Sequence, residues 1–160
     1  MKAILMLLVL VSLYACNNGD TSKPSGADGW LKGDENQKFA TIAKQLRGFD
    51  MAMVETGYRY QELYWAGKDE NWEYAAYQAE KIKVAVENGL ERRPKRAVSA
   101  QDFLHIALPE IGKAIAGGDT IQFNRAFTAL TANCLACHAS EKVSFVTVKI
   151  PVERQSPVRK

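Results

Sequence analysis

The sequence has few cysteines and histidines and lacks the common nucleotide-binding motifs. Its 160 residues include three cysteines and two histidines, with neither a Walker-type phosphate loop nor a dinucleotide-binding glycine pattern. The formal net charge is only +3, and no basic stretch is interleaved with aromatic residues. We therefore expect no nucleic-acid partner. No acid–base pair or second metal cluster is evident, so we do not expect an independent enzyme.

What is present suits one exported globular domain. The chain is 47% hydrophobic and 24% charged, which is ordinary for a folded domain of this length. Lys2 precedes an apolar run over 3–15 that is shorter than the roughly 20 residues a membrane-spanning helix needs. We interpret 1–15 as a signal peptide.

The end of this signal resembles the lipobox of bacterial lipoproteins. Residues 13–16 read Leu-Tyr-Ala-Cys, and the resemblance implies that Cys16 carries the lipid and becomes the new N-terminus. It also implies a periplasmic protein anchored to a bacterial membrane, and Asn17 agrees with sorting to the outer membrane. An ordinary cleaved signal is the alternative. The polar residues up to 33 predict a flexible tether, so that 16–33 joins the lipid to the folded part.

From residue 34 onward, apolar residues recur at helical spacing and predict an all-α domain over 34–141. The expected helices span 34–67, 69–89, 99–117 and a last stretch from 119 onward. Glycines mark the ends of the first three. In the first helix the apolar stripe is Phe39, Ile42, Leu46, Phe49, Met53, Gly57, Tyr60 and Tyr64.

The third and fourth helices have recognisable capping signals. Ser99 with Asp102 resembles a capping pair that opens the third helix, and Pro109 is expected to kink or interrupt it. Asp119 with Gln122 is expected to cap the fourth. The tail 142–160 is first apolar and then basic, and we expect an extended strap. Short connections between four amphipathic helices favour an antiparallel four-helix bundle.

The last helix carries the most specific motif of the chain, Cys134-Leu135-Ala136-Cys137-His138. Two thiols three residues apart lie on one helix face, within reach of both vinyl groups of a porphyrin, and the next histidine can approach its iron. The motif predicts one covalently attached haem c, with His138 as the proximal iron ligand. Because both cysteines continue the apolar stripe of this helix, we expect the haem inside the bundle, near the end of the last helix.

Alternatives to haem are weaker in this sequence. A zinc site would need a second cysteine or histidine pair, which is absent. A redox dithiol usually lies in a strand–helix–strand context, which is also absent. The sixth position of the iron stays open: Met53 is the best-placed thioether, and core packing is its alternative role. His105 lies beside the apolar stripe of the third helix, as a boundary or surface residue would.

Four helices with Cys134, Cys137 and His138 at the end of the last resemble the cytochrome c′ and cytochrome c-556 group. The resemblance implies a cytochrome that carries single electrons between redox partner proteins. The stretch Tyr64-Trp65-Ala66-Gly67 followed by Asn71-Trp72 also resembles a segment of exported bacterial cytochrome c proteins, and that resemblance favours methionine ligation by Met53, as in cytochrome c-556. A five-coordinate cytochrome c′ type that binds nitric oxide or carbon monoxide is the alternative, and an accessory subunit of a larger assembly is a third. A homodimer agrees with any of them. The basic run over 92–96 suits haem propionates, an acidic partner or a solvated loop.

Overall fold

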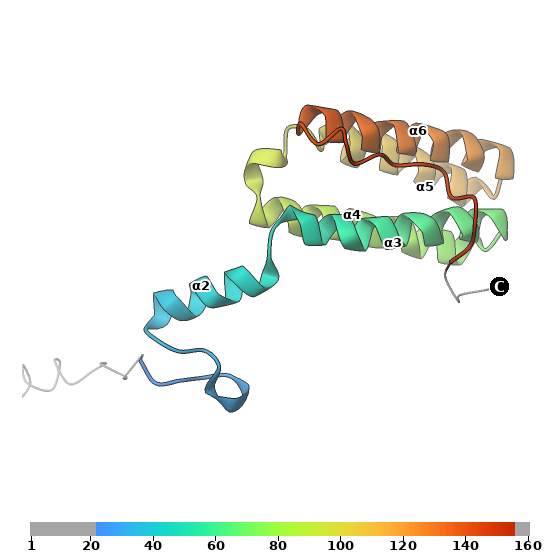
Figure 1. The fold of residues 1–160 in the computed structure, drawn as a ribbon. Helices are drawn as coiled ribbons and strands as arrows, with labels where there is room; N and C mark the ends of the chain where they lie inside the picture. The colour runs from blue at the N-terminus through green and yellow to red at the C-terminus, as the bar shows by residue number, and fades with distance from the viewer. Residues whose placement is uncertain (1–21, 156–160) are drawn as a thin grey trace, which may run out of the picture. The chain divides into compact units, whose positions relative to one another are not determined.

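A computed structural model describes residues 22–155, and these residues are all-α, as predicted (Figure 1). Apart from an isolated bridge between Ser25 and Leu31, the described residues contain no β-pairing. None of their helices has the length and apolar character needed to cross a membrane. The predicted signal peptide 1–15 and the lipidation site Cys16 lie outside the described residues.

The chain divides into two compact units, the first ending at Arg47 and the second beginning at Gly48. The described part of the first unit contains a short 3-10 helix, Ala27–Gly29, and helix α2, Glu35–Leu46. A capping box opens α2: the Asp34 carboxylate accepts the Gln37 N–H at 2.8 Å, and the Gln37 side chain accepts the Asp34 N–H at 2.9 Å.

The single helix expected over 34–67 is wrong, because the chain forms two helices there. Helix α2 ends at Leu46, and α3 spans Phe49–Lys68. Between them Arg47 adopts a φ of 60°, a left-handed conformation that stops a helix. Phe39 and Leu46, expected in the core, are exposed. The apolar spacing runs on across the break, so periodicity alone gave no sign of it.

The second unit is built from four helical segments that pack on one another. They are α3, α4 (Trp72–Arg92), α5 (Leu108–Gly117, preceded by a π-helical turn at Phe103–Ala107) and α6 (Thr120–Ser140). Helix α3 packs on α4, α4 on α5, α5 on α6, and α6 on α3. Figure 1 shows α3 beside α4 and α5 beside α6. The largest fully buried side chains are Phe123, Phe127, Leu63, Ile82, Ile111, Leu130 and Gln78.

The prediction that the second helix ends at Gly89 is wrong, because α4 continues to Arg92. A Cβ at Gly89 would lie 2.7 Å from the Ala52 Cβ and 2.8 Å from a ring carbon of Phe49. The glycine therefore permits close approach of α3 and α4, and packing rather than helix termination explains it.

The expected start of the third helix is also wrong in its details. Asp102 makes no capping hydrogen bond, and the Ser99 hydroxyl instead donates to the carboxylate of Glu141, beyond the end of α6. Pro109 does interrupt the α-helix, as predicted, because a π-helical turn at Phe103–Ala107 lies directly before it and α5 begins at Leu108. Such a turn relieves the clash of the proline ring with the preceding carbonyl. At the fourth helix, Asp119 accepts two backbone N–H groups and caps α6 as predicted.

Candidate haem-binding site

The residues of the predicted haem motif lie on the last two turns of α6. Cys134, Cys137 and His138 are all half-buried, and neither cysteine forms a disulfide. Their spacing of three and four residues puts them on one face of the helix. Further up α6, Phe123 and Phe127 are 0% and 1% exposed. The buried face of α6 therefore becomes partly open where the motif begins.

The surroundings of the two cysteines disfavour their charged forms. Burial raises the pKa of the Cys134 thiol to about 12, and burial also raises the pKa of Cys137. Zinc ligation and thiol–disulfide exchange both require the thiolate. A thioether to haem carries no charge, so the half-buried position suits it better than either alternative.

His138 has a defined partner on one side of its ring. Its Nδ1 lies 2.7 Å from the carbonyl oxygen of Val146. A carbonyl oxygen only accepts, so Nδ1 carries the proton and the neutral ring keeps its lone pair on Nε2. Metal-bound histidines characteristically donate their other ring N–H to a carbonyl or carboxylate in this way. The side chain is thus in the tautomer that a metal ligand through Nε2 requires.

The Val146 carbonyl comes from the tail that follows α6, which runs back along the helices (Figure 1). The tail is held at two further points. Lys149 accepts a hydrogen bond from the Tyr60 hydroxyl through its carbonyl, at 3.3 Å. Arg154 donates to the Asp69 carboxylate at 2.5 Å and lies 4.9 Å from the centre of the Trp65 ring.

Helices α3 and α6 run antiparallel, and their contacts define a register. Toward the C-terminus of α3, the Cα of Gly67 faces the ring of Phe123, since an added Cβ would meet that ring at 2.1 Å. About one turn back, the rings of Tyr64 and Phe127 are 5.0 Å apart. A further turn back, the hydroxyls of Tyr60 and Thr131 are 2.7 Å apart. Each step of about one turn back along α3 is thus matched by a step of about one turn forward along α6.

Continued by seven residues on each helix, the same register would bring Met53 level with His138. Met53 is half-buried and packs against the core. At the start of α3 the buried residues are Ala52 and Thr56, each one position before a member of the predicted stripe, and the two lines meet at Tyr60. Met53 therefore lies at the edge of the core. Gly57, which the stripe includes, is exposed, and an added Cβ there would meet no atom within 4 Å.

Two buried polar atoms near this end have no hydrogen-bond partner among the described residues. They are Thr56 Oγ1, three residues after Met53 on α3, and Arg92 Nε at the end of α4. The contact of Gly89 with Phe49 brings the end of α4 to the same level as the beginning of α3. Unsatisfied buried groups are uncommon in folded proteins and often mark a missing ligand or water.

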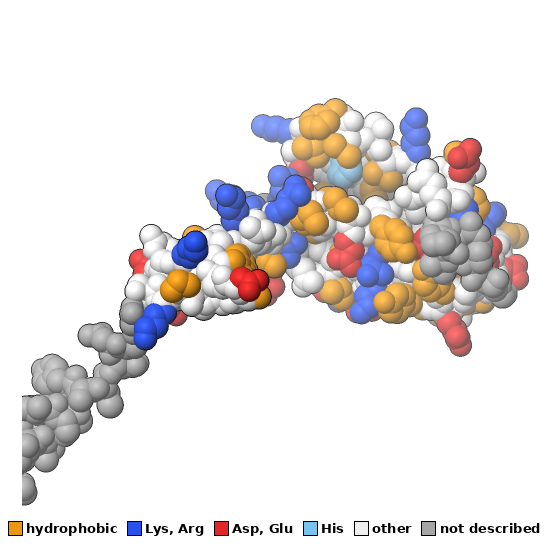
Figure 2. Space-filling model, turned by 60° about the horizontal axis from the view of Figure 1, so that its bottom comes forward, with side chains coloured by type: hydrophobic (Ala, Val, Ile, Leu, Met, Phe, Trp, Pro, Cys, Tyr) orange, Lys and Arg blue, Asp and Glu red, His pale blue; other side chains and the backbone are white. Residues whose placement is uncertain are grey.

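The basic run after α4 contributes structure as well as charge. Arg96 forms an ion pair with Glu141 and lies 5.7 Å from the centre of the Phe49 ring, which ties the end of α6 to the start of α3. Arg93 and Lys95 are exposed. On the face drawn in Figure 2, Lys and Arg side chains lie among hydrophobic ones.

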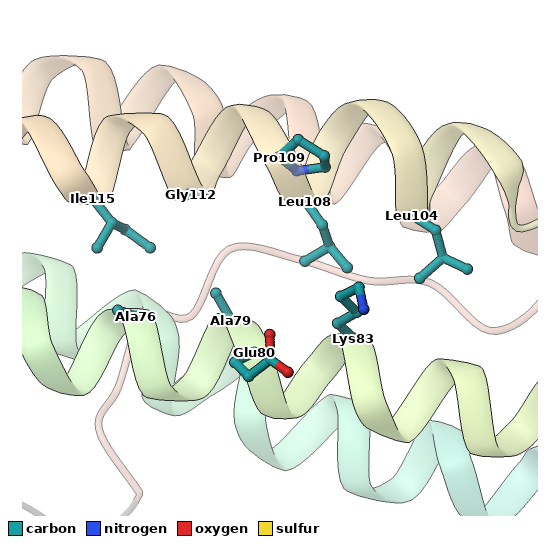
Figure 3. A pocket seen from close by; sticks show the side chains of 9 residues that line it. All are labelled: Ala76, Ala79, Glu80, Lys83, Leu104, Leu108, Pro109, Gly112 and Ile115. Carbon is teal, nitrogen blue, oxygen red and sulfur yellow. The ribbon is translucent and has the colours of Figure 1, made fainter.

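The remaining candidates lie elsewhere. His105 is exposed, as expected for a boundary or surface residue. A groove of about 250 Å³ runs between α4 and α5, where Ala76, Ala79 and Gly112 leave room (Figure 3). None of the predicted haem residues lines it. Within residues 22–155, no group of three or more histidine, cysteine, aspartate and glutamate side chains is arranged to hold a metal ion.

Sequence reasoning missed the partners that surround the motif, namely Val146, Glu141 and Ser99. Val146 acts through its backbone carbonyl, which no side-chain pattern reveals. Glu141 and Ser99 are common surface residue types in a sequence, and only their contact across 42 positions gives them a role. No family model matches the chain, and no curated protein or solved structure matches it either.

Proposed function

We propose that this protein is a monohaem c-type cytochrome that carries single electrons, with haem bound to Cys134 and Cys137 by thioethers and His138 as the proximal ligand. The main support is the hydrogen bond from His138 Nδ1 to the Val146 carbonyl. It lies beside two free, half-buried thiols on the same helix face. When bound, haem c supplies an iron that takes up and releases one electron.

Three residues of α6 would hold the haem, two through thioethers and one through its imidazole. Cys134 and Cys137 prevent its loss, and their burial favours uncharged sulfur. His138 presents the lone pair of Nε2. In this proposal α3, α4, α5 and α6 form an antiparallel four-helix bundle with the haem near the end of α6, and the contacts that close the order α3–α4–α5–α6–α3 support it.

Met53 is our proposed distal ligand. The antiparallel register of α3 and α6 supports this assignment, because its continuation would bring Met53 level with His138. A thioether favours ferrous over ferric iron and so raises the reduction potential. The open space at Gly57, one turn further along α3, agrees with a flat ligand lying against that helix.

Arg92 is our proposed partner of a haem propionate. Its Nε is buried and has no hydrogen-bond partner among the described residues. An arginine beside a carboxylate forms charge-assisted hydrogen bonds, which would satisfy this atom. Arg96, in contrast, is already paired with Glu141.

We further propose a periplasmic lipoprotein, anchored through lipidated Cys16 after removal of 1–15, whose partners are redox proteins. The polar stretch after Cys16 and the absence of nucleotide- and nucleic-acid-binding motifs in the sequence support this assignment. The outer membrane is the proposed location because Asn17 follows Cys16.

Export of the full chain in bacteria that attach haem c tests this function first. We expect a purified protein with one haem per chain that resists acid–acetone extraction, measured by the pyridine haemochrome spectrum and by intact mass. The matched control, Cys134→Ser with Cys137→Ser, should lose covalent haem entirely and keep its helical circular dichroism. A wild-type protein without covalent haem would overturn the proposal.

The distal side is tested by carbon monoxide. With Met53 bound, the reduced protein should have a low-spin spectrum and form little carbon monoxide adduct at modest concentration. Met53→Ala should convert it to a rapid carbon monoxide binder, whereas Met51→Ala, at an exposed position of the same helix, should not. Unchanged spectra in Met53→Ala would favour the five-coordinate, gas-binding alternative.

A further inference from the structure

The tail after α6 is anchored to the helices more firmly than a simple chain end requires. Val148 packs against the core, and Arg154 pairs with Asp69 at the opposite end of α3 from Met53. The tail also covers the Tyr60–Thr131 pair, because the Lys149 carbonyl accepts from the Tyr60 hydroxyl. These contacts fix the course of the chain from Val143 to Arg154.

The first part of this tail is a turn built directly on the motif. The Val143 N–H donates to the His138 carbonyl at 2.9 Å, and the Val146 N–H donates to the Val143 carbonyl at 2.8 Å. The turn returns the chain to the His138 ring, where the Val146 carbonyl accepts from Nδ1 at 2.7 Å. The backbone of the turn, and not a side chain, therefore supplies the partner of the ring.

We propose that residues 143–154 are a positioning strap that holds the His138 ring in its Nδ1–H tautomer and lowers the reduction potential of the bound haem. This inference rests on the proposed haem function. A hydrogen bond from Nδ1 makes Nε2 a stronger donor to the metal, and a stronger donor favours ferric over ferrous iron. Its effect on the potential is opposite to that of Met53.

The strap affects the haem only through His138. Tyr60 and Arg154 hold the strap and do not touch His138, so they position the ring indirectly. Arg154 is largely buried, and its guanidinium holds both the Asp69 carboxylate and, at 3.4 Å, the Trp65 carbonyl. Loosening this end gives the strap more freedom without touching the turn at Val146. The expected effect on His138 is therefore in the same direction and smaller.

Val146→Pro in the full-length holoprotein is the decisive variant. Proline removes the N–H that closes the turn onto Val143 and so displaces the carbonyl that faces His138. Val152→Pro is the matched control, because it places a second proline in the same tail at a residue that is 90% exposed. Phe145→Ala, at an 83% exposed residue of the turn, controls for side-chain loss.

Two measurements report on the strap. The first is the reduction potential, which should rise in Val146→Pro. A tenfold weaker preference for ferric iron, at the low end of second-shell effects, corresponds to about 59 mV for one electron. The second is the solvent exchange of the His138 Nδ1 proton, followed by NMR of the reduced protein, which should become at least about tenfold faster. Phe145→Ala should leave both values unchanged, and Val152→Pro, near the Arg154 end of the strap, should shift them no more than Arg154→Gln does.

The outcomes separate this inference from the proposed function. A wild-type protein without covalent haem overturns both. A haem-loaded Val146→Pro protein with wild-type potential and a protected ring proton overturns only the strap. If Val146→Pro fails to fold, Arg154→Gln decides: smaller shifts in the same directions support the strap, and wild-type values for both measurements overturn it.

Discussion

The two ends of the α3–α6 pair are built from the same two helices and differ in how closely their side chains are packed. At one end Gly67 lets α3 approach the ring of Phe123, and Leu63, Phe123 and Phe127 are 0–1% exposed. At the other end Met53, Cys134, Cys137 and His138 are half-buried, and the polar atom of Thr56 lacks a partner.

This difference separates stability from chemistry along one helix pair. The aromatic end is closely packed around Phe123 and Phe127, so these residues are replaceable only at a cost in packing. The motif end keeps its sulfur and imidazole groups half-buried. Buried polar atoms without a partner among the described residues occur toward both ends, Thr56 Oγ1 near the motif and Glu62 Oε1 and Trp65 Nε1 near the aromatic cluster, so the exposure of the reactive side chains is what sets the motif end apart. Function is expected at the end where packing is incomplete.

The largest effect on stability is expected from Phe127→Ala, at the aromatic end. Phe127 is 1% exposed and contacts the rings of Tyr60, Tyr64 and Phe123. Its loss should lower the free energy of unfolding by about 3–5 kcal/mol, measured by chemical denaturation. Phe145→Ala, at an 83% exposed position, should change it by less than about 0.5 kcal/mol. Equal effects of the two variants would contradict a packed aromatic end.

Two glycines of α3 differ in the same way, since one lies in a closely packed region and the other in open space. A Cβ at Gly67 would meet Phe123 at 2.1 Å, whereas a Cβ at Gly57 would meet no atom within 4 Å. Gly67→Ala should destabilise the protein by about 1–3 kcal/mol through overpacking. Gly57→Ala should stabilise the protein without haem by up to about 1 kcal/mol, because alanine is the better helix former. Thermal unfolding of both variants measures the difference, and destabilisation by Gly57→Ala would show that the space at Gly57 is filled.

The smallest effect is expected between the two ends, at Tyr60. Burial raises the pKa of its hydroxyl from 10.0 to about 12. The unfolded chain therefore loses this proton at a lower pH than the folded chain does. Stability should be complete below about pH 10 and decline as the pH rises toward 12.

Tyr60→Phe should cost about 1 kcal/mol at neutral pH, because it removes the hydroxyl that bonds Thr131 and the Lys149 carbonyl. It should also flatten the decline above pH 10, although Tyr74, whose pKa burial likewise raises to about 12, keeps part of it. Denaturant midpoints at pH 9 and pH 11 measure both effects. An unchanged slope in Tyr60→Phe would contradict the assignment to Tyr60.

Local patterns predicted much of the helical unit. The apolar stripe predicted for the third helix, Leu104, Leu108, Ile111 and Ile115, is buried as expected across the π-helical turn and α5, and so are Ile82 and Val86 of α4. One helical period dominates both stripes. The stripe of the first helix failed because it spans two helices whose apolar positions happen to stay in phase across Arg47.

The roles of some glycines and capping residues were predicted wrongly, because each of these residue types has more than one structural role. Gly89 resembles a helix end in sequence, but its missing Cβ serves the contact with Ala52. Ser99 resembles a cap, but its hydroxyl is bonded to Glu141, 42 residues away. A local pattern does not distinguish a backbone role from a packing role when the deciding neighbour is distant in sequence.

The positions of the two thiols and the imidazole on one helix face follow from covalent order and the 3.6-residue repeat alone, so the sequence is enough to predict them. Only the tertiary structure decided how they are held. It brought the Val146 carbonyl to Nδ1 of His138 and set the antiparallel register of α3 and α6 at Tyr60 and Thr131. Both depend on contacts between chain segments, and such contacts arise from the packing of the whole core rather than from any local pattern.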